Sequence, residues 1–258
     1  MDLSGRTALV TGAASGMGAA AAETFARLGA TVVGADVSDD AGEPLFARLG
    51  NPHRYTHLDV GVAPDWEQLA ELAPGLDLAF LNAGIMTRPA DVPILDDPVE
   101  WLTPERFRRV MAVNTDGVGF GLAATIPLIQ ANGGGDIVIT ASGAGVQPFE
   151  PDPVYSASKY AVVGLARALT PWLAHRNIRI NVVCPHSVLT GIVPKDLRAL
   201  PDKKFSSPQY IADSVLRILE SGETGRVWMA RAEDEPAWPI HYEDVTPKAS
   251  YIRERAPL

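Results

Sequence analysis

The sequence predicts an α/β domain with a mostly parallel sheet of about seven strands and helices on both faces. Short apolar, β-branched runs alternate with longer helical patterns, and most runs end in polar or turn-forming residues. A chain of 258 residues with 47% hydrophobic content suits one sizeable core. The predicted strands are TALVT (from Thr7), TVVGAD (from Thr31), RYTHLDV (from Arg54), LDLAFLNAG (from Leu76), GDIVITAS (from Gly135), IRINVVCP (from Ile178) and GRVWMA (from Gly225).

The segments between these runs carry the helical pattern. AAAAETFARLG is closed by Gly29, a longer segment runs from Thr103 through Asn114 to Gln130, and another follows Pro153. We therefore expect a single domain over residues 1–231. Residues 232–258 are rich in proline and lose periodicity, which predicts a wrapping tail or a lid.

Charge and composition exclude several classes of protein. The formal net charge is -9 with no block of consecutive basic residues, so a nucleic-acid partner is not expected. The first five residues hold no basic leader and no segment reaches 18 uninterrupted apolar residues, so we expect a cytoplasmic protein without a membrane partner. Cys184, the only cysteine, excludes an intramolecular disulfide and is expected to be a small buried hydrophobe.

The carboxyl ends of the predicted strands are chemically unusual. Ligands of open parallel α/β sheets collect beyond these ends. Most residues found there are polar or turn-forming, as a nucleotide site requires: Gly12, Asp36, Asp59, Asn82, Ser142 and Pro185.

The segment TGAASGMG follows the first strand directly and opens the alanine-rich helix. Gly12 allows a tight turn, Gly16 a close approach of a pyrophosphate, and Gly18 close packing of helix on strand. The N–H groups at the start of the helix would bind the anionic oxygens. Alone the loop could be an ordinary turn; in this context it predicts a Rossmann-type dinucleotide site. No Gly-Lys-Ser/Thr follows, which disfavours a P-loop nucleotidase.

Asp36 ends the second predicted strand, 24 positions after Gly12. This is close to the distance expected for a carboxylate that binds the hydroxyls of the adenosine ribose. The same charge would repel a 2′-phosphate, and neither Val37, Ser38 nor Ser15 offers a cation for one. We therefore predict NAD in preference to NADP, while a loop aspartate that caps the next helix remains the alternative.

After Pro153 the helical pattern places Tyr155 and Lys159 about 40° apart on one face. The face continues with apolar residues, so the pair should emerge at the sheet edge. The spacing alone could arise by chance. A phenol has a pKa near 10 and is a poor base at neutral pH, but a nearby ammonium and the positive nicotinamide ring would favour the phenolate. Lowering the pKa by two or three units, each worth about 1.4 kcal/mol, would put a useful fraction of the phenol in its basic form.

Ser142 ends the fifth predicted strand and could donate a hydrogen bond to a substrate oxygen as negative charge develops. The alternative is an ordinary serine in the TASGAG turn. Together these residues resemble the short-chain dehydrogenase/reductase family over about residues 3 to 230. The matching elements are Thr11-Gly12-x-x-x-Gly16-x-Gly18, Asn82-Ala83-Gly84, Asn114, Ser142 and Tyr155-x-x-x-Lys159, with 13 residues from Ser142 to Tyr155.

The resemblance implies roles for individual residues. It implies a Rossmann fold, a nicotinamide cofactor and Tyr155 as the catalytic acid/base. Lys159 would tune Tyr155 and bind ribose, Ser142 would position the substrate, and Asn114 would hold a water that links Lys159 to solvent. Asp59 and Val60 are expected beside the adenine, with Asn82, Ala83 and Gly84 under the ribose, although each could be a turn. The remaining expected cofactor contacts are Ser15, Met17, Pro185, Val188 and Thr190.

Two departures from the family pattern stand out. The turn after the sixth strand is usually Pro-Gly, whereas here it is Pro185-His186. His186 could touch the substrate or cofactor, but a side chain that points to solvent is the simpler reading. The Asp-Gly-Gly ending of the tetrameric members is also missing, which weakens the carry-over of tetramer geometry. We therefore expect a homo-oligomer that is either a homodimer or a homotetramer.

The predicted pocket walls are three largely apolar loops. Their apolar residues are Met86, Ile94, Phe149, Ile192, Val193, Leu197 and Leu200. We expect NAD-dependent oxidation of a hydrophobic secondary alcohol to its ketone. The alternatives are an NADP-using ketoreductase of a biosynthetic pathway and a catalytically silent NAD-binding sensor. A methyltransferase has no use for Tyr155 and Lys159, and an extended epimerase or dehydratase would be longer.

His53 and His57 are four residues apart, a metal-binding spacing on a helix. Here they fall in a predicted strand with no third ligand nearby, so no metal site is expected.

Overall fold

The computed structural model describes residues 1–199 and 204–240. In these residues the chain forms one eight-stranded sheet in the order β3-β2-β1-β4-β5-β6-β7-β8. The first seven strands pair in parallel, and β8 pairs antiparallel with β7. The strands are β1 (Thr7–Thr11), β2 (Thr31–Asp36), β3 (Arg54–His57), β4 (Leu76–Leu81), β5 (Gly135–Thr140), β6 (Ile178–Pro185), β7 (Val227–Ala230) and β8 (Trp238–Pro239).

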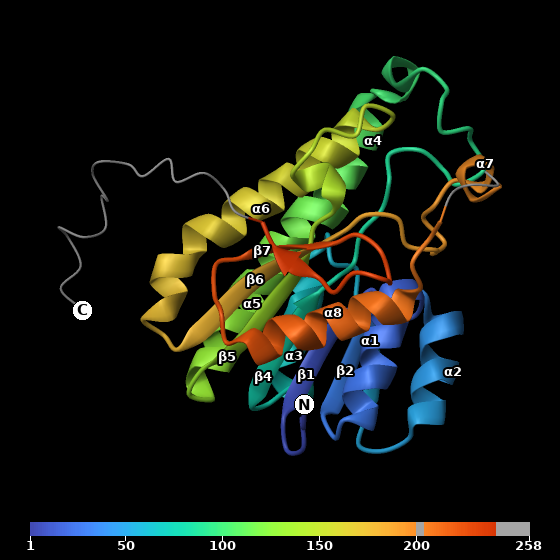
Figure 1. Ribbon diagram of the computed structural model, residues 1–258. Helices are drawn as coiled ribbons and strands as arrows, with labels where there is room; N and C mark the ends of the chain where they lie inside the picture. The colour runs from blue at the N-terminus through green and yellow to red at the C-terminus, as the bar shows by residue number, and fades with distance from the viewer. Residues whose placement is uncertain (200–203, 241–258) are drawn as a thin grey trace, which may run out of the picture.

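Helices cover both faces of this sheet (Figure 1). Residues of α1, α2 and α8 share one core cluster, and residues of α3, α5 and α6 share the other. The helices are α1 (Gly16–Arg27), α2 (Asp39–Leu49), α3 (Leu69–Leu72), α4 (Pro104–Met111), α5 (Gly117–Ala131), α6 (Pro153–Ala174), α7 (Lys195–Arg198) and α8 (Pro208–Ser221). Shorter turns are η1 (Ala63–Gln68), η2 (Pro98–Trp101), η4 (Gly143–Gly145) and the π-helical η3 (Ala112–Asp116).

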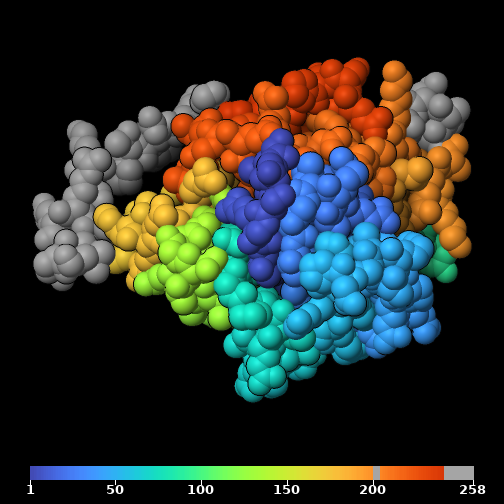
Figure 2. All heavy atoms as spheres, turned by 90° about the horizontal axis from the view of Figure 1, so that it is seen from below, coloured from blue at the N-terminus to red at the C-terminus, as the bar shows by residue number. Residues whose placement is uncertain are grey.

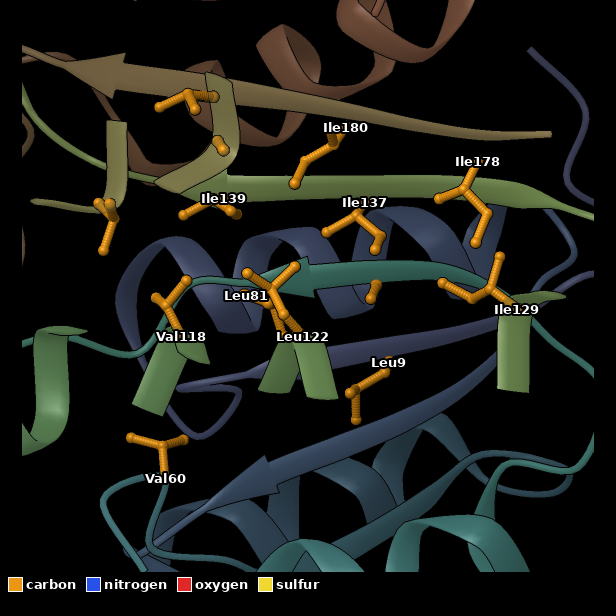
Figure 3. Packing of buried hydrophobic residues seen from close by; sticks show 14 of the residues in the cluster. Leu9, Val60, Leu81, Val118, Leu122, Ile129, Ile137, Ile139, Ile178 and Ile180 are labelled. Carbon is orange, nitrogen blue, oxygen red and sulfur yellow. The ribbon is translucent and has the colours of Figure 1, made fainter. Parts of the chain in front are cut away.

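The core lies in two layers because side chains alternate along each strand. In β1, Leu9 points into the cluster under α5, while Ala8 and Val10 point toward α1 and α8. Figure 3 shows Leu9 beside Leu81 and Leu122 in the first layer. Each fully buried Leu or Ile contributes about 1.5–3 kcal/mol to the free energy of unfolding, so these layers hold the sheet rigid.

The two ends of the described chain meet on one face of the sheet. α1 packs against α8, and Gln209 donates a 3.0 Å hydrogen bond to the hydroxyl of Thr24. In the view from below, the N-terminal segments (blue) adjoin the C-terminal segments (orange; Figure 2). The last long helix therefore supports the half of the sheet that holds the glycine-rich loop.

The switch point of the sheet lies between β1 and β4. Crossovers from β1 run toward β3, whereas the later strands continue on the other side from β4. In sheets of this kind, ligands bind beyond the carboxyl ends of the strands at such a switch point. Gly12 and Asn82 are the first residues of the loops after these two strands, and they approach each other closely.

The seven predicted strands are confirmed, and β8 is a correction. Trp238–Pro239 lies inside the segment expected to be a tail, yet it adds an antiparallel edge strand. Tyr210 donates from its hydroxyl to Glu235 O at 2.7 Å, and Arg217 donates to Ala237 O at 2.9 Å, which binds this segment to α8. Two residues that include a proline give no apolar run to detect. The rest of the predicted tail, 241–258, lies outside the described residues.

By length and composition alone, one helix among the described residues, Pro104–Ala131, is apolar enough to cross a membrane. The sequence led us to expect no such segment. A sheet-covering helix meets the same criterion, and this one packs on β4 and contributes Leu122 and Ile129 to the core. We read it as a core helix with an apolar outer side.

Candidate active site

The glycine-rich loop has the shape of a phosphate cradle. Gly12 and Gly16 have φ values of +68° and +53°, a region that side chains disfavour. A Cβ on Gly18 would lie 2.0 Å from Gly12 O, so the loop and the first turn of α1 can pack this tightly only around glycine. Ser15 precedes α1 in an extended conformation with no side-chain cap. The first N–H groups of α1 are thus available to an anion, which fits a pyrophosphate.

Thr11, which the sequence analysis named only as the first residue of the glycine-rich motif, ties this loop to the one after β4. Its hydroxyl accepts hydrogen bonds from Asn82 N at 2.9 Å and Ala83 N at 3.1 Å. The Asn82 side chain donates to Thr11 O at 3.1 Å and accepts from Thr140 at 3.1 Å. Asn82 and Ala83 are therefore structural members of the site floor. A polar residue that ends an apolar strand was the available signal for Thr11.

Asp36 connects the glycine-rich loop with the end of β2. One carboxylate oxygen accepts from Ala14 N and the other from Ser38 N, each at 3.0 Å. Ser38, not Asp36, occupies the N-cap of α2. Each oxygen keeps acceptor capacity, so the partly exposed carboxylate can also receive ribose hydroxyls. This arrangement fits the predicted nucleotide role better than the alternative role as a helix cap.

The other predicted cofactor residues differ in how close they lie to the glycine-rich loop. Thr190 faces the glycine-rich loop, because a Cβ on Gly16 would lie 3.2 Å from its methyl carbon. Asp59 lies beyond β3, where its side chain accepts from Gly61 N at 2.9 Å. Val60 points into the core, and its carbonyl accepts from Trp66. Pro185 and Val188 are buried, and Met17 is partly exposed beside the loop. Val60 can therefore reach an adenine only with its backbone.

Helix α6 places Tyr155 and Lys159 in its first two turns. Asp152 caps the helix by accepting from Tyr155 N at 3.1 Å, and Pro153 takes the first helical position. Val162 and Ala166 continue the same side of the helix into the core. The predicted face is confirmed: apolar anchoring fixes the helix, and its polar head reaches the carboxyl edge of the sheet.

Lys159 is buried, with 2% of its surface exposed. Its Nζ donates to Thr140 O at 3.0 Å and lies 5.6 Å from the centre of the Tyr155 ring. A Cβ on Gly84 would lie 3.2 Å from Nζ, so Gly84 leaves the room that the lysine occupies. Burial lowers the pKa of Lys159 to about 8, which brings its proton within reach of physiological exchange.

Tyr155 differs from expectation in its acidity. Burial raises the pKa of Tyr155 to about 12, and the hydrogen bond with Ser142 acts in the opposite direction. Asp152 and Cys184 raise the pKa further. The sequence led us to expect a lowered value, with the positive nicotinamide contributing to it. In the protein alone the cost of burying a phenolate outweighs the favourable contacts.

Ser142 holds its own turn together and also lies beside Tyr155. Its Oγ accepts from Ala144 N at 3.1 Å and so caps the short turn η4. The same hydroxyl lies close enough to Tyr155 to lower the pKa of its phenol. Beside it, burial raises the pKa of Cys184 to about 12, so this thiol is the inert buried hydrophobe that was expected.

Asn114 lies in the π-helical turn η3 and is fully buried. Its Oδ1 accepts from Ile85 N at 2.8 Å, and its Nδ2 donates to Ile85 O at 2.9 Å and to Ser158 Oγ at 3.0 Å. Ser158, a residue missed at first, donates to Tyr155 O at 2.7 Å. A Cβ on Gly84 would lie 3.3 Å from Asn114 Oδ1, so Asn114 and Lys159 border the same space.

His186 follows directly after β6. The residue is exposed, and a Cβ on Gly143 would lie 3.3 Å from its Nδ1. The imidazole therefore borders the turn that carries Ser142.

Two of the predicted pocket walls are joined to each other. Lys195 N donates to Ala90 O, and Ile94 N donates to a carboxylate oxygen of Asp196, each at 2.8 Å. These bonds link α7 to the loop after β4 above the carboxyl edge (Figure 1). Ile94 and Val193 are buried in this arrangement, whereas Leu200 lies outside the described residues.

The two histidines considered as metal ligands have other partners. His53 Nδ1 accepts from Val32 N at 3.2 Å, and His57 pairs with Asp39 at 3.0 Å. In the described part of the chain, no three His, Cys, Asp or Glu residues are grouped to hold a metal. A surface hollow of about 600 Å³ lies beside His57, between α2 and β3, and its lining includes none of the predicted site residues.

Comparisons with known proteins agree with this geometry. A family model described as short chain dehydrogenase matches residues 6–200. The chain belongs to the short-chain dehydrogenase/reductase family. It is 34% identical over 234 residues to a 2,5-dichloro-2,5-cyclohexadiene-1,4-diol dehydrogenase of Sphingobium indicum, covering 84% of this chain and 91% of that protein. It is 36% identical over 201 residues to (+)-borneol dehydrogenase 1 of Salvia officinalis, covering 75% and 74%.

Two solved structures share this fold over most of the chain. A 3-ketoacyl-(acyl-carrier-protein) reductase from Brucella melitensis complexed with NADH has a TM-score of 0.79 and 27% identity, covering 89% of this chain and 98% of that one. A putative NAD(P) dependent gluconate 5-dehydrogenase from Beutenbergia cavernae with bound NADP has a TM-score of 0.77 and 29% identity, covering 89% and 96%. The protein is a Rossmann-fold oxidoreductase that uses a nicotinamide cofactor to interconvert alcohols and ketones.

Proposed function

We propose that this short-chain dehydrogenase oxidises a hydrophobic, ring-bearing secondary alcohol to its ketone with NAD, using Tyr155 as the base. The observation that carries the proposal is the meeting of Tyr155 and Ser142 beside buried Lys159, at the sheet edge that also holds the glycine-rich loop. Bound nicotinamide supplies the hydride acceptor for oxidation and the hydride donor for the reverse reaction.

Tyr155 would take the hydroxyl proton of the alcohol, because its phenol lies beside Ser142 and buried Lys159 at the head of α6. Ser142 would donate a hydrogen bond to the substrate oxygen while negative charge builds on it. A general base of this kind contributes typically 10²–10⁴-fold to a rate. Since burial raises the pKa of Tyr155 to about 12, the basic form and the oxidation rate should both increase as the pH rises.

Lys159 and Asn114 would take part in moving the proton that Tyr155 takes from the substrate. A lysine whose pKa is lowered to about 8 can release and regain a proton near neutral pH. Asn114 and Gly84 border the space beside its Nζ. Asn114 also fixes Ile85 through both of its side-chain groups, so it holds one wall of that space in place.

NAD is favoured over NADP by the carboxylate of Asp36. It stands at the end of β2 with both oxygens bonded to backbone N–H groups and with acceptor capacity remaining. A 2′-phosphate at this position would meet a negative charge. The substrate class follows from the apolar loops and from the names of the diol and borneol dehydrogenases among the relatives. A second copy of the chain is proposed as a partner, in a homodimer or a homotetramer.

The deciding experiment is a panel of cyclic and open-chain secondary alcohols assayed by nicotinamide absorbance with NAD and with NADP. We expect turnover of cyclic alcohols, with higher kcat/KM for NAD. Tyr155→Phe should lower kcat by at least about 10³-fold while the dissociation constant of NAD changes little. Tyr160→Phe, a change at the exposed tyrosine of the same helix, is the matched control. Turnover retained in Tyr155→Phe would contradict the assignment of the base.

A further inference from the structure

Asp152 is a buried carboxylate at the start of the catalytic helix, with 1% of its surface exposed. One oxygen accepts from Tyr155 N at 3.1 Å and from the Thr87 hydroxyl at 2.5 Å. The other oxygen accepts from Thr87 N at 2.9 Å. Among the residues that the structure describes, no lysine, arginine or histidine forms an ion pair with it. Capping a helix requires only the first of these bonds, so the other two call for a separate explanation.

The bonds to Thr87 join the loop after β4 to α6. Asn114 holds Ile85 by its N–H and carbonyl, and Asp152 holds Thr87 two residues later. The residue between them, Met86, is partly exposed and belongs to a predicted wall of the substrate pocket. Two buried side chains thus fix both ends of this short wall, and one of them also fixes the backbone of Tyr155.

Further contacts strengthen the same junction. Arg106 on α4 donates to Thr87 O at 3.1 Å, and Arg88 donates to Pro151 O at 2.7 Å. The Arg106 guanidinium lies 4.2 Å from the centre of the Trp101 ring. The loop after β4 is therefore held to α4 and to the segment before α6 by charged donors, with Asp152 at the centre of the junction.

We propose that Asp152 is a positioning residue for the dehydrogenase reaction, which ties the pocket wall at Thr87 to Tyr155 and sets the electrostatic environment of the phenol. The inference rests on the proposed function for its kinetic readouts. The charged or titratable groups close to Tyr155 are Asp152 and Lys159 on its own helix and Cys184 on β6. His186 lies beside the turn that carries Ser142, and Arg88 lies across the junction. Of these, the carboxylate of Asp152 and the thiol of Cys184 raise the pKa of Tyr155.

Asp152→Asn tests the charge. Asparagine keeps the oxygen that caps Tyr155 N, but its amide faces the N–H of Thr87 and cannot accept from it. Removal of the negative charge stabilises the phenolate, so the rising limb of kcat for alcohol oxidation should move to lower pH. We expect a shift on the order of half a unit to one unit. A limb that coincides with that of the wild type would overturn the electrostatic part of the proposal.

Thr87→Val tests the tie without changing any charge. Valine keeps the backbone bond to Asp152 and loses the hydroxyl bond, so we expect kcat to fall about 10-fold while the dissociation constant of NAD stays within about twofold. Thr87→Ser restores the hydroxyl and should recover most of the rate. Wild-type kcat in Thr87→Val would overturn the positioning role.

Two further measurements keep the outcomes distinct. Amide hydrogen exchange over residues 85–88 and 152–156 needs no substrate. We expect faster exchange in Thr87→Val than in Thr87→Ser, and equal rates would count against the tie.

Asp97→Asn is the control for the charge. It removes another capping aspartate, which is exposed and accepts a hydrogen bond from Val99 N, and it should leave the pH limb unchanged. A wild-type protein that oxidises no alcohol would instead contradict the proposed function, while the exchange result would still decide the tie.

Discussion

At the residue scale, the selectivity between NAD and NADP depends on Asp36. Asp36→Ala should relax the preference for NAD about 10-fold or more, because it removes both the ribose acceptor and the charge that repels a 2′-phosphate. Asp36→Asn keeps the side-chain shape and shows the share that is due to charge. The measurement is kcat/KM for both cofactors with one alcohol.

The control for this prediction is Asp39→Ala. Asp39 lies three residues further along and pairs with the exposed His57, so its loss should leave cofactor selectivity unchanged. Unchanged selectivity in both Asp36 variants would mean that Asp36 serves the protein only by binding Ala14 and Ser38.

Some site residues can be recognised from the sequence alone, and others cannot. Tyr155, Lys159 and Ser142 could be predicted because their chemistry and spacing converge on one use, and the structure brings them together. Thr11 and Asp152 act through hydrogen bonds to residues more than 60 positions away. Such partners depend on the fold. For Asp152, the sequence Asp-Pro at the head of a helix was nevertheless a recognisable capping signal.

At the element scale, the junction of β1 and α1 depends on Gly18. Gly18→Ala places a methyl group 2.0 Å from the backbone oxygen of Gly12, and a backbone atom cannot rotate away. We expect a loss of about 1–3 kcal/mol in the free energy of unfolding. NAD binding should weaken with it, because the displaced loop forms the phosphate cradle. Urea unfolding and the quenching of tryptophan fluorescence by NAD measure the two effects.

A glycine in α6 provides the matched control. An added Cβ on Gly164 meets no atom within 4 Å, and its φ is compatible with a side chain. Gly164→Ala should therefore leave NAD binding unchanged and raise the free energy of unfolding by about 0.5–1 kcal/mol through helix propensity. Equal effects of the two substitutions would contradict the steric explanation for Gly18.

Element boundaries show what local patterns omit. The segment expected as one helix from Thr103 to Gln130 is α4 and α5 joined by the π-helical turn that holds Asn114. The hydrophobic periodicity of the sequence does not reveal the wider π-helical turn. In the sequence, Asn114 is only a mildly unfavourable residue within a helix. π-helical turns are frequent at functional sites, and here the turn aims a buried amide at Ile85 and Ser158.

At the scale of the whole molecule, the alternation of strands and helices was sufficient to predict the parallel sheet and its ligand edge. Right-handed crossovers leave few ways to order such strands, so the switch point beside Gly12 follows from the pattern. The antiparallel β8 did not, because its pairing with β7 depends on the course of a proline-containing segment over α8. The junction of α7 with the loop after β4 is likewise a contact between distant loops.

The outer side of α4 and α6 carries the feature that bears on assembly. Phe107, Tyr160 and Trp172 are 43%, 42% and 42% exposed. In the apolar 18-residue window of helix Pro104–Ala131, 39% of the residues are buried within the chain. Exposed apolar surface of this kind is typical of protein interfaces.

We therefore predict that a second copy of the chain covers this face through a two-fold interface, in which each α6 meets its counterpart. Light scattering after size exclusion should give a mass of at least twice 27.5 kDa. Trp172→Glu combined with Tyr160→Glu places two charges in the interface and should reduce the mass to that of one chain, because their burial is costly. Leu95→Glu, at an apolar residue that is 86% exposed on another segment, should leave the mass unchanged. A wild-type mass of one chain, or a doubly substituted protein that stays assembled, would place the contact elsewhere or exclude it.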